Sequence, residues 1–329
     1  MRLSVVGATT AVAVTAILAS VLFLAPASAG AHNAAVDSSA ALPLTAVGPG
    51  KTTLTYCDEN GVAETLDIYE PNPVPSTPVP AVVYVHGGGW VGGSSAFAAG
   101  SLVGQVARSI EAKGWIFVSI DYSLAPRFRW PAPIEDAKCA IRFLRAASST
   151  LEIDPGAIGA MGDSAGGQIV SLLGLARPSA GFDVGQDLDQ SSGVQAVVDL
   201  YGPADLTTPD WIQTVLIQSD ASKVFGTALG PAAPGTPAAD TLEKAGPVTY
   251  VGPDEPPFLI IQGDDDSVVP ADQSTELADR LQVAGNAATL VLVSHAQHGL
   301  LSADGATVTP SVPTLARRTV SFLERSLQS

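Results

Sequence analysis

Short runs of apolar residues, each long enough for one strand, recur along this chain. A continuous apolar run is typical of a strand buried on both faces, because a strand with one face in water alternates apolar and polar residues. Helical stretches separate most of these runs, and that alternation predicts an α/β fold with a mostly parallel sheet covered on both faces. The five clearest runs are residues 81–85, 115–120, 194–200, 258–261 and 289–293.

Three further segments complete a predicted sheet of eight strands. Residues 52–57 and 63–69 alternate apolar and polar side chains around Asn60-Gly61, a dipeptide typical of hairpin turns, and residues 157–161 form another apolar run. The spacing of apolar residues predicts helices at about 100–113, 134–147, 165–176, 271–284 and 312–327.

The interval 204–250 shows no buried-strand pattern and contains several prolines. It is too long for a simple loop inside a folded domain. We therefore predict that 204–250 is a partial cap over the carboxyl edge of the sheet, inserted into a single domain that spans residues 51–329.

The first 50 residues lack the pattern of the folded part. An apolar stretch, 3–25, is followed by Ala27-Ser28-Ala29, a small-residue cleavage site. This arrangement predicts a secretory signal peptide over residues 1–29 and therefore a secreted protein. The alternative is an uncleaved N-terminal membrane anchor, because the stretch is long enough to span a bilayer. Residues 30–50 are predicted to be a flexible leader.

Acidic residues outnumber basic residues, with 32 Asp and Glu against 16 Lys and Arg and a net charge of -16. Repulsion would oppose binding to nucleic acid or to an anionic membrane, so we expect neither as a stable partner. The sequence leaves the oligomeric state open. Export would place Cys57 and Cys139 in an oxidising compartment. A disulfide and two free buried thiols are equally compatible with the sequence, which does not give the distance between them.

The stretch Gly162-Asp163-Ser164-Ala165-Gly166-Gly167 lies between the apolar run 157–161 and a predicted helix. A serine in a Gly-x-Ser-x-Gly turn from strand to helix is the nucleophile elbow of acyl-transfer enzymes. The glycines remove Cβ clashes in the tight turn, and the new helix directs backbone N–H groups toward a developing oxyanion. Ser164 is therefore predicted to be the nucleophile.

A second glycine motif, His86-Gly87-Gly88-Gly89-Trp90, directly follows the strand predicted at 81–85. Adjacent glycines leave backbone N–H groups unshielded, so they can approach a ligand oxygen closely. A serine nucleophile needs such donors, because its attack places negative charge on the carbonyl oxygen. The motif predicts an oxyanion loop, in which we expect His86 to have a structural role.

A catalytic serine also requires a histidine base and an acid. Of the chain's four histidines, His295 and His298 both follow the last predicted strand, and we predict His298 as the base because it precedes a glycine in a loop. The acid should follow a strand between the serine and the histidine. Asp266, the last of three consecutive aspartates, fits this position best, and Asp199 is the weaker alternative. Ser164, Asp266 and His298 follow the chain order of the α/β-hydrolases.

Residues from about 69 to 299 resemble the α/β-hydrolase superfamily. The similarity is strongest to hormone-sensitive-lipase-like esterases and to small secreted carbohydrate esterases of the acetyl and feruloyl esterase type. The resemblance implies an α/β-hydrolase fold, an oxyanion hole formed by the amides of Gly88, Gly89 and Ala165, and no metal or organic cofactor. Besides the two glycine motifs, the matching segments are residues 121–126, 130–136, 256–266 and 269–270.

The sequence also departs from the pattern of that family. Ser123 and Arg127 stand where the family usually has Arg and Glu, so a structural ion pair is expected to be absent or rebuilt. Gln262 replaces a common His and is expected to lie away from the chemistry. The short leader leaves little room for a large N-terminal cap, which implies an open site. Trp90 is predicted to form an aromatic wall for substrate, with simple loop packing as the alternative.

Together these features predict a secreted serine carboxylesterase that hydrolyses short-chain acyl esters of a small-molecule or carbohydrate alcohol through an acyl-enzyme. A lipase or a peptidase on the same fold is one alternative. A catalytically silent binding protein is another, although the presence of serine, histidine and acid argues against it.

Overall fold

The computed structural model describes residues 45–46, 50–59, 62–208, 215–302 and 305–328. All of them belong to one unit of the chain, Leu42–Ser329. The predicted signal peptide and most of the predicted leader lie outside the described residues, so both remain predictions. Among the described residues, no helix combines the length and the apolar character needed to cross a membrane.

The apolar runs of the sequence form the strands of one sheet, in the order β1-β2-β3-β5-β4-β6-β7-β8-β9. Strands β4 to β9 are parallel to one another, and β3 is antiparallel to both β2 and β5. Strands β2 to β9 are the eight predicted strands, and β1 adds two residues at one edge. The bounds are β1 Thr45–Ala46, β2 Lys51–Glu59, β3 Val62–Tyr69, β4 Val79–Val85, β5 Ile116–Ile120, β6 Ile153–Asp163, β7 Ala196–Leu200, β8 Phe258–Gly263 and β9 Ala288–Val293.

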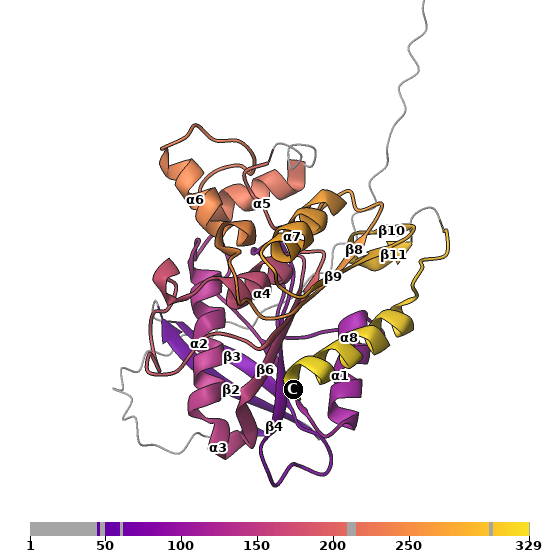
Figure 1. Ribbon diagram of the computed structural model, residues 1–329. Helices are drawn as coiled ribbons and strands as arrows, with labels where there is room; N and C mark the ends of the chain where they lie inside the picture. The colour runs from indigo at the N-terminus through magenta and orange to yellow at the C-terminus, as the bar shows by residue number, and fades with distance from the viewer. Residues whose placement is uncertain (1–44, 47–49, 60–61, 209–214, 303–304, 329) are drawn as a thin grey trace, which may run out of the picture. The chain divides into compact units, whose positions relative to one another are not determined.

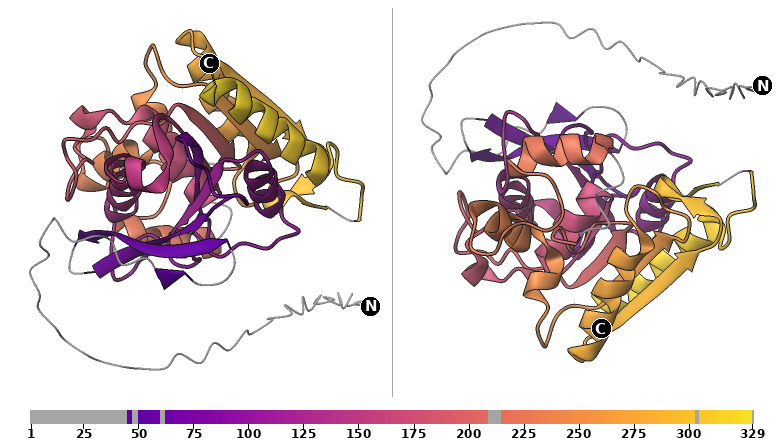
Figure 2. Two further views of the ribbon diagram at one scale, coloured as in Figure 1. Left: turned by 90° about the horizontal axis from the view of Figure 1, so that it is seen from below. Right: turned by 90° about the horizontal axis from the view of Figure 1, so that it is seen from above.

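Helices cover both faces of this sheet, as the apolar runs predict. Figure 1 shows α1 and α8 on one side of the strands and α2 and α4 on the other. Figure 2 shows the hairpin of β2 and β3 at one side of the unit and the orange C-terminal strands at the opposite side. The helix bounds are α1 Leu102–Ala112, α2 Ala132–Ala146, α3 Ser148–Leu151, α4 Ala165–Leu175, α5 Val215–Phe225, α6 Pro237–Ala245, α7 Ala271–Val283 and α8 Val312–Leu327.

Strand β4 shows why a run of consecutive apolar residues is needed in this fold. Side chains alternate between the two faces of a strand. Ala81, Val83 and Val85 enter the core beneath α2 and α4, whereas Val82 and Tyr84 enter the core beneath α1 and α8. Because all five are buried, every position of the strand contributes to a hydrophobic core.

Helices α5 and α6 lie beyond the carboxyl end of the strands (Figure 1). They come from the interval 204–250, and a short 3-10 helix, Pro247–Tyr250, completes it. Thr236 caps α6, because its hydroxyl accepts a hydrogen bond from the amide of Ala239 at 3.3 Å. The predicted cap interval therefore contains helices at the edge of the sheet where the active site of this fold class lies.

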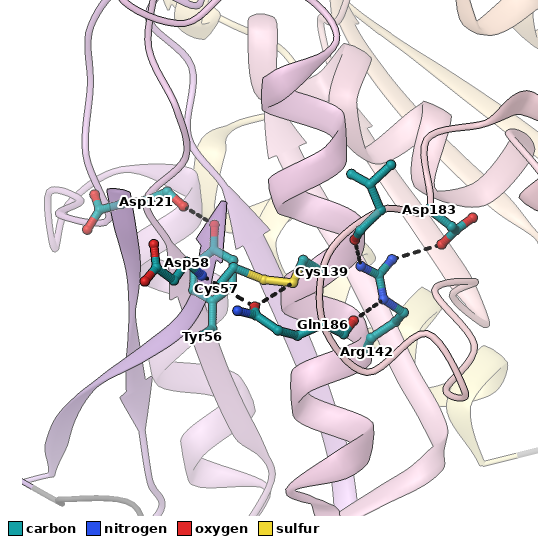
Figure 3. Close-up of a disulfide and its surroundings, with 9 residues drawn as sticks. Tyr56, Cys57, Asp58, Asp121, Cys139, Arg142, Asp183 and Gln186 are labelled. Carbon is teal, nitrogen blue, oxygen red and sulfur yellow. Dashed lines mark hydrogen bonds and ion pairs between the residues drawn. A yellow bond between two sulfur atoms is a disulfide. The ribbon is translucent and has the colours of Figure 1, made fainter. Parts of the chain in front are cut away.

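Cys57 on β2 and Cys139 on α2 form a disulfide, with 6.4 Å between their Cα atoms (Figure 3). This bond decides between the two alternatives that the sequence left open. It connects the antiparallel hairpin at one edge of the sheet to the helix that covers one face.

Helix α2 also carries three buried cations, Lys138, Arg142 and Arg145. Arg142 Nε donates to the carbonyl of Gln186 at 2.9 Å, and Nη1 donates to Asp183 at 2.9 Å (Figure 3). Burial lowers the pKa of the Lys138 ammonium, and the nearby Asp183 carboxylate opposes that shift. These cations attach the helix to residues 182–195, which form a long connection without regular structure.

Arg145 extends the same attachment along the helix. Its guanidinium donates to the carbonyls of Pro155 at 3.0 Å, Ser191 at 2.5 Å and Gly193 at 2.6 Å. A backbone carbonyl outside helices and strands has no partner in a regular hydrogen-bond ladder, so a side chain or water must donate to it. The arginines of α2 therefore supply the donors that the connection 182–195 lacks.

Candidate active site

Ser164 is the single residue between β6 and α4. Its backbone has φ 53° and ψ −117°, a conformation that is rare for a residue with a Cβ atom. A Cβ on Gly166 would lie 2.0 Å from the carbonyl oxygen of Val85, and a Cβ on Gly162 would lie 2.3 Å from that of Gly166. The turn thus requires glycine on both sides of the serine and holds Ser164 in a strained, projecting position.

The structure brings Ser164, His298 and Asp266 together in hydrogen-bonding geometry. Nε2 of His298 lies 2.9 Å from Oγ of Ser164, and Nδ1 of His298 lies 2.8 Å from Oδ2 of Asp266. Ser164 follows β6, Asp266 follows β8 and His298 follows β9, so the carboxyl edge of the parallel strands positions all three. In this arrangement the imidazole can take the serine proton while the carboxylate orients the ring.

The alternative residues lie elsewhere. Asp264 accepts a hydrogen bond from the backbone N–H of His295 at 2.7 Å, and both residues are exposed. The carboxylate of Asp199 accepts from the amide of Gly202 at 2.8 Å and from the Ser171 hydroxyl at 3.1 Å. Burial raises the pKa of Asp199 from 3.8 to about 6. Asp199 therefore holds Gly202 and Ser171 of α4 together, and its carboxylate does not bind His298.

Gln262 was expected to lie away from the chemistry, and the structure shows that this expectation is wrong. The side chain contacts the acid of the active site. Its Nε2 donates to Oδ2 of Asp266 at 3.2 Å and to the carbonyl of Val269 at 3.1 Å. The hydroxyl of Ser274 donates to Oε1 of Gln262 at 2.9 Å. Gln262 is fully buried at the end of β8, so the helix that follows holds the amide against the acid.

The glycine motif after β4 forms a tight loop beside the elbow. Gly88 has φ 119° and Gly89 has φ 61°, both in the region that favours glycine. A Cβ on Gly88 would lie 2.1 Å from the carbonyl oxygen of Gly92. The loop thus needs a residue without a side chain where it passes the serine.

Asp163, the residue before the nucleophile, anchors this loop. Its Oδ1 accepts a hydrogen bond from the Tyr84 hydroxyl at 2.5 Å and from the amide of Gly87 at 3.0 Å. Burial and the neighbouring Asp163 carboxylate raise the pKa of Tyr84 well above its usual range, so the phenol stays protonated and remains a donor. One carboxylate therefore fixes the loop relative to Ser164.

The amides of Gly88, Gly89 and Ala165 donate to no described residue. Each of these residues lines the cavity that contains Ser164 and His298, whose volume is about 340 Å³. Free N–H groups beside a nucleophile are the donors that a tetrahedral oxyanion requires. Val268 and Val269 supply part of the apolar lining of the same cavity.

His86 is buried against Tyr122, with 4.3 Å between the stacked rings. Burial lowers the pKa of the His86 imidazole, and its Nδ1 lies 2.7 Å from the carbonyl oxygen of Gly87. A Cβ on Gly93 would lie 2.3 Å from Nδ1 of His86. His86 thus fills the inside of the glycine loop, a position that agrees with the structural role expected for it.

Trp90 lines the cavity, although its side chain is only 3% exposed. The indole Nε1 donates to Oε1 of Gln168 at 2.9 Å, and the ring meets Phe225 edge-on at 5.1 Å. These contacts correspond to the loop-packing alternative weighed for Trp90. An additional role as a wall for substrate remains a prediction.

Two further residues line the cavity that the sequence did not predict as site residues. Tyr201, which follows β7 with φ 45°, places its ring 4.9 Å from the imidazole of His298. Asp220 on α5 also lines the cavity. The only signal for Tyr201 is its position directly after a buried strand, and no local motif marks Asp220.

The family ion pair at positions 123 and 127 is absent. The amide of Ser123 donates to Asp136 at 2.7 Å, and its hydroxyl donates to Glu64 at 3.2 Å. Arg127 is exposed and stacks over Phe128 at 5.0 Å. Burial, reinforced by the nearby Asp136 carboxylate, raises the pKa of Glu64 from 4.5 to about 7.

Among the described residues, no group of three or more His, Cys, Asp or Glu side chains could hold a metal ion. The arrangement found instead is a serine, a histidine and an acid on an α/β-hydrolase fold. The profile of the BD-FAE family matches residues 66–281. The chain therefore belongs to the BD-FAE family of α/β-hydrolases.

The relatives of the chain include named esterases. It is 30% identical to Esterase LipC of Mycobacterium tuberculosis over 264 residues, which are 77% of this chain and 61% of LipC. It is 32% identical to the probable carboxylic ester hydrolase LipM of the same organism, over 68% of this chain and 50% of LipM. The chain thus spans about half to three fifths of the length of these curated relatives.

Solved structures show the same fold over most of the chain. A truncated carbohydrate esterase from gut microbiota superimposes with a TM-score of 0.67 and 26% identity, over 84% of this chain and 97% of that one. Thermogutta terrifontis esterase 2 superimposes with a TM-score of 0.67 and 22% identity, over 88% of this chain and 97% of that one, a likeness of fold alone.

Proposed function

We propose that this protein is a serine carboxylesterase that hydrolyses short-chain acyl esters. The observation that carries the proposal is the hydrogen-bonded triad of Ser164, His298 and Asp266. Ser164 and His298 line a cavity together with the residues whose amides donate to no described residue. Each component answers one chemical requirement of acyl transfer: a nucleophile, a base, an orienting acid and donors for the oxyanion.

In the proposed mechanism, His298 Nε2 takes the proton of the Ser164 hydroxyl as Oγ attacks the ester carbonyl carbon. The amides of Gly88, Gly89 and Ala165 stabilise the oxyanion, and Asp266 stabilises the imidazolium. The imidazolium then protonates the departing alcohol, which leaves the acyl group on Ser164. His298 then takes a proton from water as the water oxygen attacks the acyl carbon. The bond from that carbon to Ser164 Oγ breaks, the imidazolium returns its proton to Oγ, and the carboxylic acid leaves.

The size of the cavity supports a preference for short acyl groups. Each buried methylene contributes about 0.8 kcal/mol only where a pocket receives it, and about 340 Å³ must hold the reacting ester and part of the alcohol. A carbohydrate alcohol is supported by the truncated carbohydrate esterase among the solved relatives. The disulfide between Cys57 and Cys139 supports secretion, because such bonds persist in oxidising compartments.

The decisive test combines Ser164→Ala with a fluorophosphonate probe that labels activated serines. We expect the wild type to be labelled and to hydrolyse 4-nitrophenyl acetate, and Ser164→Ala to lose both properties at unchanged melting temperature. Loss of the nucleophile typically costs about 10⁶-fold in turnover. Residual activity above one hundredth of the wild type in the folded variant would refute the proposal.

A chain-length series separates esterase from lipase. We expect kcat/KM to rise little beyond 4-nitrophenyl butyrate, whereas a steady rise to the octanoate or palmitate would indicate a deep apolar tunnel and a lipase. Cleavage of peptide substrates in preference to esters would indicate a peptidase. A wild type that neither reacts with the probe nor cleaves any substrate would indicate a silent binding protein.

A further inference from the structure

The cavity around Ser164 is lined by charge of one sign. Among the described residues that line it, the charged side chains are Asp163 and Asp220, and the titratable imidazole is His298; neither lysine nor arginine is among them. The charge of Asp163 is directed away from substrate, because its Oδ1 accepts from the Tyr84 hydroxyl and the Gly87 amide. Asp220 is the carboxylate whose role the proposed mechanism does not explain.

Asp220 projects from α5 toward the glycine loop. A Cβ built on Gly89 would lie 3.5 Å from Oδ2 of Asp220, so this oxygen stands directly against the loop whose amides face the ester. Oδ1 accepts from Lys223 Nζ at 2.8 Å. Oδ2 accepts a hydrogen bond from no residue that the structure describes. One oxygen thus binds Lys223, and the other has no partner among the residues that the structure describes.

The position of Asp220 is at the mouth of the cavity. Its side chain is 33% exposed, more than the 24% of His298 in the same cavity. In the esterase function proposed above, the acyl group is placed beside the serine and the oxyanion amides, and the alcohol part is placed toward the mouth and Asp220. A carboxylate there accepts hydrogen bonds from hydroxyl or ammonium groups and repels another carboxylate.

We propose that Asp220 is a specificity-determining residue that selects esters by the charge of their alcohol part. It favours hydroxyl-rich or cationic alcohols and disfavours anionic ones. The proposal rests on the esterase function proposed above, and it narrows the substrate class of the same site. The ion pair with Lys223 moderates the effect, since the ammonium offsets part of the carboxylate charge.

The test uses three acetate esters of similar size: 4-carbamoylphenyl acetate, 4-carboxyphenyl acetate and 4-trimethylammoniophenyl acetate. They carry the same acyl group and a neutral, anionic or cationic alcohol. For the wild type we expect kcat/KM to fall in the order cationic, neutral, anionic. In Asp220→Asn we expect the ratio of neutral to anionic kcat/KM to fall about fivefold, an effect reduced by the partial exposure of the carboxylate.

Two matched variants isolate the position of the charge. Asp240→Asn removes one negative charge from α6 in the same cap interval, at an exposed residue that does not line this cavity, so the ratio should equal that of the wild type. Lys223→Met removes the ammonium that pairs with the Asp220 carboxylate, so the ratio of neutral to anionic kcat/KM should increase. An unchanged ratio in Asp220→Asn, or an equal change in Asp240→Asn, would overturn the proposal.

The outcome also separates this inference from the esterase function. If the wild type fails to hydrolyse 4-carbamoylphenyl acetate and the other esters, the proposed function itself is wrong. If hydrolysis occurs with the same neutral-to-anionic ratio in all variants, only the charge selection is wrong. If Asp220→Asn does not fold, the ratio of neutral to anionic kcat/KM is measured for the wild type from 10 mM to 0.5 M salt. Added salt screens the carboxylate, so the ratio should fall toward 1, and a constant ratio would overturn the proposal.

Discussion

Asp266 shows at the scale of one residue how the fold positions the acid of the active site. Its Oδ1 accepts from the amides of Val268 at 2.8 Å and Val269 at 2.9 Å. Its Oδ2 accepts from Gln262 Nε2 and faces His298 Nδ1. These hydrogen bonds fix the position of the carboxylate, so it holds the imidazole of His298 in one orientation.

Gln262 is therefore expected to act as a positioning residue. In Gln262→Leu the carboxylate of Asp266 loses one donor, and we predict that kcat falls about tenfold, equivalent to about 1.4 kcal/mol, while KM changes little. Gln262→His supplies a ring N–H at the same place and should recover part of kcat. Gln282→Leu, an exposed glutamine on α7, serves as the control and should leave both constants unchanged.

The two neighbouring histidines should differ sharply in their effect on turnover. We predict that His298→Ala lowers kcat at least about 10³-fold, because it removes the group that receives the serine proton. His295→Ala should stay near the wild type, since the side chain is exposed and the contact to Asp264 uses the backbone N–H. Initial rates with 4-nitrophenyl acetate measure both, and equal losses would contradict the assignment of the base.

The sequence predicts the three residues of the catalytic triad because each has a characteristic local context: a glycine turn, a strand end followed by aspartates, and a histidine after the last strand. No such local context identifies Gln262, Tyr201 or Asp220. Their roles depend on tertiary contacts: α5 carries Asp220, Ser274 of α7 binds Gln262, and the end of β7 places Tyr201 against His298.

At the scale of elements, apolar periodicity identifies strands and long helices well and their ends less well. Helix α2 begins at Ala132, two residues before the predicted start, because Pro133 in its first turn needs no hydrogen-bond partner for a backbone N–H. Strand β7 begins at Ala196 rather than at 194. Helices α5 and α6 were not predicted individually, since their mixed composition hides the periodicity within a proline-rich interval.

The disulfide belongs to this scale, because it connects two elements 82 residues apart in sequence, β2 and α2. We predict that the double variant Cys57→Ala, Cys139→Ala is about 2–4 kcal/mol less stable than the wild type, mainly through greater freedom of the unfolded chain. Thermal unfolding measures the loss. The initial rate at 25 °C should stay unchanged, since neither cysteine lines the catalytic cavity; a matching loss of rate would contradict a purely stabilising role.

At the scale of the whole molecule, the burial of two carboxyl groups should make part of the folding stability depend on pH in an unusual direction. The folded-state pKa of Glu64, about 7, lies above its ordinary value of 4.5, and that of Asp199, about 6, lies above 3.8. At these two sites the folded state therefore binds a proton more tightly than the unfolded state does. The stability that these two groups contribute is present at acidic pH and is lost as pH rises through the folded-state pKa values.

Glu64→Gln tests this dependence. The amide removes the titrating group and can still accept the hydrogen bond from Ser123. We predict that the variant melts near the wild type at pH 5, where Glu64 is mostly protonated, and above it at pH 8, where the wild type carries a half-buried charge beside Asp136. A melting-temperature difference that does not grow between these pH values would contradict the shifted pKa.

The buried arginines of α2 have a consequence for how the native protein meets proteases. Residues 182–195 contain glycine, aspartate and glutamine without regular structure, a composition typical of nicking sites. Cleavage requires a segment to leave the surface and extend into the protease, yet Arg142 and Arg145 bind carbonyls along this segment. Release of the segment would leave the buried cations of α2 without these partners, so we expect the connection to open only together with the helix.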